Sequence, residues 1–203
     1  KTVGQTRDDA AGEAFDKLAR FLNLGYPGGP VIDKLAKEGD QDAIAFKRPM
    51  LEAEFGYDFS FSGTKTAVVN HVNKNPVQSH QKMADLVASF QQTVVDVLVE
   101  KTFRATKAFN CKAVALAGGV SANTSLRENL VKAALDALRL LLDVVVIDGN
   151  DLEALEIGRA GRRRNIEAHR IAAVSGKYLL GIVADHEFRK QLGGIRVRRP
   201  LHH

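Results

Sequence analysis

The most restrictive feature of the sequence is an apolar run followed by two glycines and a helix-like segment, KAVALAGGVSANTSLRENLVKAAL. Residues 113–117 are apolar and few enough for a buried parallel strand. Gly118 and Gly119 end the strand, and Ser121 or Asn123 can cap the helix that follows. This strand–turn–helix unit predicts an α/β fold. Its glycine turn favours a nucleotide-type ligand, although it matches neither the dinucleotide fingerprint nor the P-loop.

Four carboxylates lie close together near the start of the chain, within the stretch DDAAGEAFDK. We expect a helix over residues 6–24, capped by Thr6 or Asp8 and buried along a stripe of apolar residues at helical spacing. Like charges this dense repel one another, so solvent, a cation or a substrate must compensate for them. The helix dipole favours the first two carboxylates, and Arg20 lies one turn from the last of the four. The four carboxylates are Asp8, Asp9, Glu13 and Asp16.

A second glycine pair lies in the segment GYPGGPVIDKLAKEG. Gly28 and Gly29 precede Pro30, which suits the first position of a helix predicted over residues 31–37. Free amides at a helix start, with no side chains in the way, can approach an anion. An ordinary Gly-Gly turn without a ligand is the alternative. Together with Asp16, Asp33 and Asn123, these pieces describe a nucleotide-like pocket without an obvious catalytic base.

Composition excludes several other classes. The chain has 203 residues, 45% of them hydrophobic, and one cysteine, which fits a reducing compartment and excludes an internal disulfide framework. We expect no membrane span, because no apolar run reaches eighteen residues. Eleven of the 29 Lys and Arg residues fall in residues 151–203, against six Asp and Glu. This basic end can meet nucleic acid, or it is simply a solvated tail.

The remaining expected elements are weaker signals. In chain order they are a short strand at 59–61, a helix from 65, a loop over 70–80, an amphipathic helix over 81–109, a strand at 144–147 and a helix from 151.

Four segments, in this order, resemble one known family. They are GQTRDDAAGEAFDKLARFLNLGYPGGPVIDKLAKEG, DFSFSGTKTAVVN, ASFQQTVVDVLVEKT and ALAGGVSANTSLRENL. They are similar to the tRNA adenosine threonylcarbamoyltransferase family, the bacterial TsaD proteins and their relatives, formerly called O-sialoglycoprotein endopeptidase. The resemblance covers Val3 to Ala134. It implies an actin-like, Hsp70-like and sugar-kinase-like ATPase fold, of which this chain holds mostly the C-terminal lobe with its helical insertion.

The resemblance also implies a reaction and its substrate contacts. The family transfers a threonylcarbamoyl group from threonylcarbamoyl-adenylate to the adenosine beside the anticodon of ANN-decoding tRNAs. Carried over by motif, the substrate-binding residues are Asp16, Gly29, Asp33 and Asn123. The other three carboxylates near the N-terminus are then expected to be capping or structural. No residue is assigned as catalytic.

The metal site implied by the resemblance has no counterpart in the sequence. The family holds one iron or zinc ion, which acts as a Lewis acid. Its His-x-x-x-His pair would precede Lys1, and its Cys-Thr-Asp-Asn motif is absent, so no metal ligand is assigned. Asp151 falls near the place of the missing aspartate, but its neighbours do not match. Thr64 also replaces the leucine that is usual in the family.

We therefore expect residues 1–150 to be an incomplete substrate-binding lobe and residues 151–203 to be a divergent basic tail, disordered or frame-shifted. The chain would be a truncated transferase, cytoplasmic and inactive alone. Its expected partners are tRNA and other proteins of the threonylcarbamoyladenosine pathway, with self-association through the exposed lobe surface. The alternative is a non-catalytic module that binds a nucleotide or a partner. The older protease interpretation lacks a zinc-protease motif.

Overall fold

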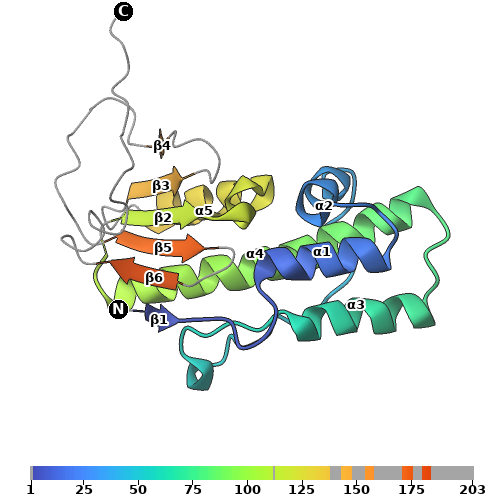
Figure 1. The fold of residues 1–203 in the computed structure, drawn as a ribbon, viewed down its shortest axis with the longest axis horizontal. Coiled ribbons are helices and arrows are strands. Elements are labelled where there is room, and N and C mark those ends of the chain that lie inside the picture. Colours follow the sequence, from blue (N-terminus) through green and yellow to red (C-terminus); the bar gives the residue numbers. More distant parts are fainter. Residues whose placement is uncertain are drawn as a thin grey trace, which may run out of the picture.

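The computed structural model describes residues 2–111, 113–137, 143–147, 154–157, 171–175 and 180–183. It has a mixed sheet beside a group of helices (Figure 1). The strands are β1 (Thr2–Gly4), β2 (Ala113–Ala117), β3 (Asp143–Ile147), β4 (Ala154–Ile157), β5 (Ile171–Ser175) and β6 (Leu180–Val183). The α-helices are α1 (Ala11–Phe21), α2 (Gly28–Ala36), α3 (Ser62–Lys74), α4 (His80–Ala108) and α5 (Thr124–Ala137). Two short 3₁₀ helices are η1 (Ala53–Phe55) and η2 (Gly119–Ala122).

The sheet has the strand order β1-β6-β5-β2-β3-β4. The central strand β2 runs parallel to both β3 and β5, while β1, β4 and β6 pair antiparallel with their neighbours. The apolar run that the sequence marks as a buried parallel strand is therefore the centre of the sheet. The α/β fold class is confirmed, and so is the predicted strand at residues 144–147.

Helix α4 connects the sheet to the helical part of the molecule. It contacts β2 and β5 and also packs against α2, α3 and α5 (Figure 1). Its apolar face is buried as the periodicity predicts, with Val87, Phe90 and Val94 at most 1% exposed. The ring of Phe90 meets that of Phe15 on α1 edge to face, at 5.6 Å between centroids. Helices α1 and α4 are thus joined in one hydrophobic core.

Several predicted elements differ in the structure. The predicted strand at 59–61 reduces to a single bridge between Thr6 and Phe59. Helix α3 runs through the first part of the predicted loop and ends at Lys74. The helix expected from residue 151 is wrong over 154–157, where β4 pairs with β3. Segments this short fit both an alternating and a helical hydrophobic pattern, so pairing with a neighbouring strand decides between the two structures.

Helix α2 begins at Gly28, so Pro30 is its third residue and not its first. Proline is tolerated there because the first four amides of a helix have no acceptor within the helix.

The segment between α2 and α3 lies along α4 and is fixed to it by cationic side chains. Arg48 donates from Nε and Nη2 to Asp96 at 2.9 and 2.8 Å. The fully buried Lys101 donates to the backbone carbonyls of Gly56 and Asp58 at 3.0 and 2.5 Å. Burial, together with the nearby Arg104 charge, lowers the pKa of Lys101. Among the described helices, none is both long and apolar enough to span a membrane.

Candidate functional site

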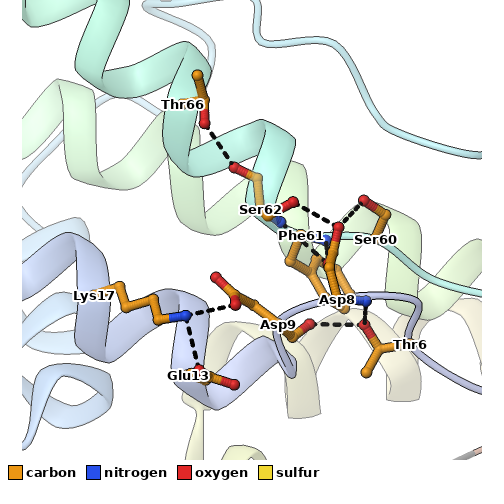
Figure 2. A network of polar contacts seen from close by, with 9 residues as sticks. All are labelled: Thr6, Asp8, Asp9, Glu13, Lys17, Ser60, Phe61, Ser62 and Thr66. Carbon is orange, nitrogen blue, oxygen red and sulfur yellow. Dashed lines mark hydrogen bonds and ion pairs between the residues drawn. The ribbon is translucent and has the colours of Figure 1, made fainter.

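The four carboxylates near the N-terminus have three separate sets of partners, two of which are drawn in Figure 2. Asp9 and Glu13 share one cation, because Lys17 Nζ lies 2.6 Å from Asp9 and 2.8 Å from Glu13. The hydrogen bonds that Lys17 donates to these two carboxylates raise the pKa of Lys17, and the bond to Glu13 lowers the pKa of Glu13. The repulsion that the sequence suggests is therefore compensated within α1 and the turn before it.

Asp8 turns away from α1 and caps α3. Its Oδ1 accepts the amides of Phe61 at 2.8 Å and Ser62 at 3.3 Å, and its Oδ2 accepts the hydroxyls of Ser60 and Ser62 at 2.5 and 2.6 Å (Figure 2). Burial alone would raise the pKa of Asp8, but these four hydrogen bonds outweigh it and the net shift is downward. The prediction that Thr6 or Asp8 caps α1 is wrong, since the N-cap is Ala10 without a side-chain bond.

Asp16 lies on α1 and holds the start of α2. Its Oδ1 accepts the amide of Gly28, the first residue of α2, at 2.8 Å. No ion pair joins Asp16 to Arg20 in the part of the chain that the structure describes, so the expected compensation by Arg20 is replaced by this amide. Asp16 thereby occupies the anion-binding position of a helix N-terminus.

The two adjacent glycines of α2 have different surroundings. A Cβ on Gly28 would lie 2.6 Å from the Cα of Asp16 and 2.7 Å from the carbonyl oxygen of Phe15, so only glycine fits between α1 and α2. A Cβ on Gly29 would meet no atom within 4 Å. The backbone at Gly29 is therefore open on the side where another residue would carry its side chain, which is compatible with the predicted substrate contact.

Asp33 connects α2 to the start of α5. Its Oδ1 accepts the amide of Thr124 at 3.1 Å, and its Oδ2 accepts the hydroxyl of Thr124 at 2.7 Å. Lys37 Nζ lies 3.7 Å from Asp33 Oδ2 and donates to the Thr124 hydroxyl at 3.3 Å. Asp33 thus satisfies the first amide of α5 across 91 residues of sequence.

Asn123 is the N-cap of α5, which confirms one of the two predicted caps. Its Oδ1 accepts the amide of Leu126 at 2.9 Å. Its Nδ2 donates to Oε1 of Gln91 on α4 at 2.8 Å. Both side chains are buried, with 7% of Asn123 and 5% of Gln91 exposed.

A polar cavity of about 150 Å³ lies between α2, α4 and α5. Asp33 and Lys37 line one side, Gln91 and Gln92 another, and Thr124 and Glu128 a third. Small-molecule sites usually enclose roughly 300–1,000 Å³, so this cavity accommodates one part of a nucleotide-sized ligand. Of the four predicted residues, Asp33 lines the cavity directly, and Asn123 is one hydrogen bond away through Gln91.

Gly29 lies one helical turn before Asp33 on the same face of α2, and Asp16 bonds to the residue beside it. The four positions therefore gather around α2 and the start of α5. Gln91 and Thr124 also line the cavity, but the sequence motifs did not indicate them as candidate site residues. A glutamine next to Phe90 on the buried face of an amphipathic helix is a signal that could have identified the first.

The iron or zinc ion implied by the family resemblance would need a cluster of ligating side chains. Among the described residues, no group of three or more His, Cys, Asp and Glu side chains is arranged to hold a metal ion. Asp151, the weak candidate ligand, lies outside the described residues. The part of the site that is described therefore does not fit a metal centre, and the expectation of a metal stays a prediction.

The fold and the site define an α/β protein in which helix N-termini and carboxylates surround a polar cavity. The family described as tRNA N6-adenosine threonylcarbamoyltransferase, TsaD, matches residues 1–142. The chain belongs to this family, and the predicted resemblance is confirmed. Family membership also supports the predicted actin-like type of fold.

Relatives with this family name occur in several bacteria. The protein of Caldicellulosiruptor saccharolyticus is 57% identical over 133 residues, which are 65% of this chain and 39% of the relative. That of Geobacter metallireducens is 55% identical over 136 residues, or 66% and 40% of the two chains. The matched part of the chain thus spans about two fifths of these relatives. A crystal structure of T. kodakarensis HypF aligns with a TM-score of 0.47 and 20% identity, covering 68% of this chain and 17% of HypF.

Proposed function

We propose that this chain supplies the adenylate-binding part of a threonylcarbamoyl transferase acting on tRNA. The observation that supports the proposal most strongly is the family match over residues 1–142, which include all four predicted contacts, together with 57% identity over 133 residues to a tRNA N6-adenosine threonylcarbamoyltransferase. The substrate is threonylcarbamoyl-adenylate, and tRNA with other proteins of the same pathway are the partners. The metal of the family, iron or zinc, and a cytoplasmic location belong to the proposal as well.

In the proposed reaction, the exocyclic amine of a tRNA adenosine attacks the carbamoyl carbonyl of the adenylate. A C–N bond forms, the bond from that carbon to the phosphate oxygen breaks, the amine loses a proton and AMP leaves. The residues described here bind and orient the adenylate. Asp33 and Glu128 can accept hydrogen bonds from hydroxyls, and the open backbone at Gly29 permits close approach. No described residue is assigned as a proton acceptor.

Two assays test the proposal. The purified chain is first incubated with tRNA, threonylcarbamoyl-adenylate and a metal ion, and modified adenosine is measured by mass spectrometry. We expect none from the chain alone, since the motifs for the family's metal are missing from its sequence. Modified adenosine formed without any other family protein would contradict that inactivity.

The second assay replaces the matched 133 residues of the C. saccharolyticus relative with those of this chain. We expect the chimaera to modify tRNA at a rate within about tenfold of the relative, because the exchanged segments are 57% identical. A folded chimaera that binds the adenylate but transfers nothing would favour the alternative, a non-catalytic binding module.

A further inference from the structure

The hydrogen bonds around Asn123 determine whether Asn123 or Gln91 presents an unused N–H donor to the cavity. Asn123 Oδ1 accepts the Leu126 amide, so this end of the amide must be the oxygen. Its nitrogen then donates to Gln91, whose contacting atom must be the acceptor Oε1. The orientation of both amides is thus fixed by one backbone N–H of α5.

Gln91 keeps its amide nitrogen available as a donor. With Oε1 committed to Asn123, its Nε2 group has two N–H donors and makes no hydrogen bond to any other described residue. Gln91 is only 5% exposed, and it lines the cavity between α2, α4 and α5. Its Nε2 is not among the fully buried side-chain atoms that lack a partner in the described residues, so this atom is accessible from the cavity and can donate to an acceptor there.

Asn123 is in the opposite situation. Its oxygen accepts an N–H of α5, one of its N–H groups is given to Gln91, and it is 7% exposed. It does not line the cavity itself. The sequence motif therefore identifies Asn123, whose side-chain amide is already hydrogen-bonded to other residues of the protein.

We infer that Gln91 is the residue that donates a hydrogen bond to the adenosine part of the ligand, and that Asn123 is a positioning residue that orients Gln91. The inference rests on the proposed function for the identity of the ligand. Adenosine offers acceptors in its ring nitrogens and ribose oxygens, which suit an amide donor, while its hydroxyls suit the carboxylate of Asp33 on the facing wall.

The central variant is Gln91→Glu. A carboxylate at this position still accepts from Asn123 Nδ2 but no longer donates to a ligand, so the protein contact is kept and the ligand contact is lost. Adenosine is used as the probe because it is uncharged, which avoids repulsion between the new carboxylate and a phosphate. We expect the dissociation constant measured by calorimetry to rise at least tenfold.

The matched control is Gln78→Glu, which adds the same charge at an exposed glutamine that does not line the cavity. We expect it to change the dissociation constant by less than about threefold. Asn123→Asp keeps an acceptor for Leu126 but cannot donate, so Gln91 turns its Nε2 towards the new carboxylate. This variant should weaken binding as much as Gln91→Glu does, and the double variant should weaken it no further.

A measurement on the unaltered chain protects the test against variants that do not fold. In ¹⁵N-labelled protein, the side-chain amide resonances of Gln91 should move on titration with adenosine by more than those of Asn123. Binding by Gln91→Glu equal to that of the unaltered chain would overturn the inference. So would larger shifts at Asn123, or no binding of adenosine by the unaltered chain.

The outcomes separate this inference from the proposed function. A donor effect at Gln91 without tRNA modification by the chimaera would leave the inference standing and reject the transferase. Normal modification by a chimaera carrying Gln91→Glu, with unchanged adenosine affinity, would reject the inference alone.

Discussion

Adjacent glycines in the first turn of α2 provide the sharpest test of the packing described here. Gly28→Ala and Gly29→Ala make the same chemical change in neighbouring positions of one helix. In both cases alanine restricts the unfolded chain, which stabilises the folded state by about 0.4–1 kcal/mol when the new Cβ fits. Only the surroundings of the Cβ differ between the two variants.

The structure sets the size of that difference. At Gly28 the Cβ would lie 2.6 Å from a backbone carbon of Asp16 and 2.9 Å from the Cβ of Ala19, so α1 and α2 must move apart. Overpacking of this kind costs about 1–3 kcal/mol. At Gly29 nothing lies within 4 Å. The stabilisation that alanine brings by restricting the unfolded chain is the same in both variants and cancels in their comparison. Gly28→Ala should therefore be less stable than Gly29→Ala by about 1–3 kcal/mol, or roughly 2–12 °C in melting temperature for a chain of this size.

Thermal unfolding followed by circular dichroism measures the difference directly, and adenosine binding is measured on the same samples. Equal melting temperatures for the two variants would refute the packing argument. Gly29→Ala should fold at least as stably as the unaltered chain and bind adenosine more weakly, because the added methyl group occupies the open side of the backbone. Unchanged affinity in this variant would remove Gly29 from the predicted contacts.

Three further predictions concern buried and capping groups. The buried hydroxyl of Thr64 has no hydrogen-bond partner among the described residues, so Thr64→Val should stabilise the protein by about 1 kcal/mol in urea unfolding. Thr102→Val loses a 2.6 Å hydrogen bond and should destabilise the protein. Hydrogen bonds hold the pKa of Asp8 below its ordinary value of 3.8. The ionised carboxylate therefore contributes fully to stability above pH 3.8, and this contribution is lost as the pH falls through the folded-state pKa. Asp8→Asn should flatten the dependence of stability on pH between about pH 5 and pH 2. Burial lowers the pKa of Lys101 below 10.5. The cost of the buried charge is relieved as the pH rises from the folded-state pKa towards 10.5, so the protein should become more stable over this range. Lys101→Met should abolish that rise in stability, measured by urea unfolding between about pH 7 and pH 10.

The sequence was most informative where structure depends on neighbours along the chain. The strand over residues 113–117, the cap at Asn123 and the buried face of α4 all follow from local periodicity and capping preferences. What the sequence could not indicate are contacts between distant segments. The bonds from Asp8 to Phe61 and from Asp33 to Thr124 span 53 and 91 residues, and local preference carries no information about either.

A common pattern explains why the motif residues are difficult to assign from substitution alone. Asp16 accepts the first amide of α2, Asp33 the first amide of α5, and Asn123 the amide two residues further into α5. Each residue predicted to contact the substrate through its side chain thus also satisfies a helix N-terminus, which is where anions are favoured. An alanine at any of them removes a cap, costing about 0.5–2 kcal/mol, so lost activity would not distinguish binding from folding. Replacements that keep the cap, such as Asn123→Asp, are therefore the informative ones, provided that stability and affinity are measured on the same protein.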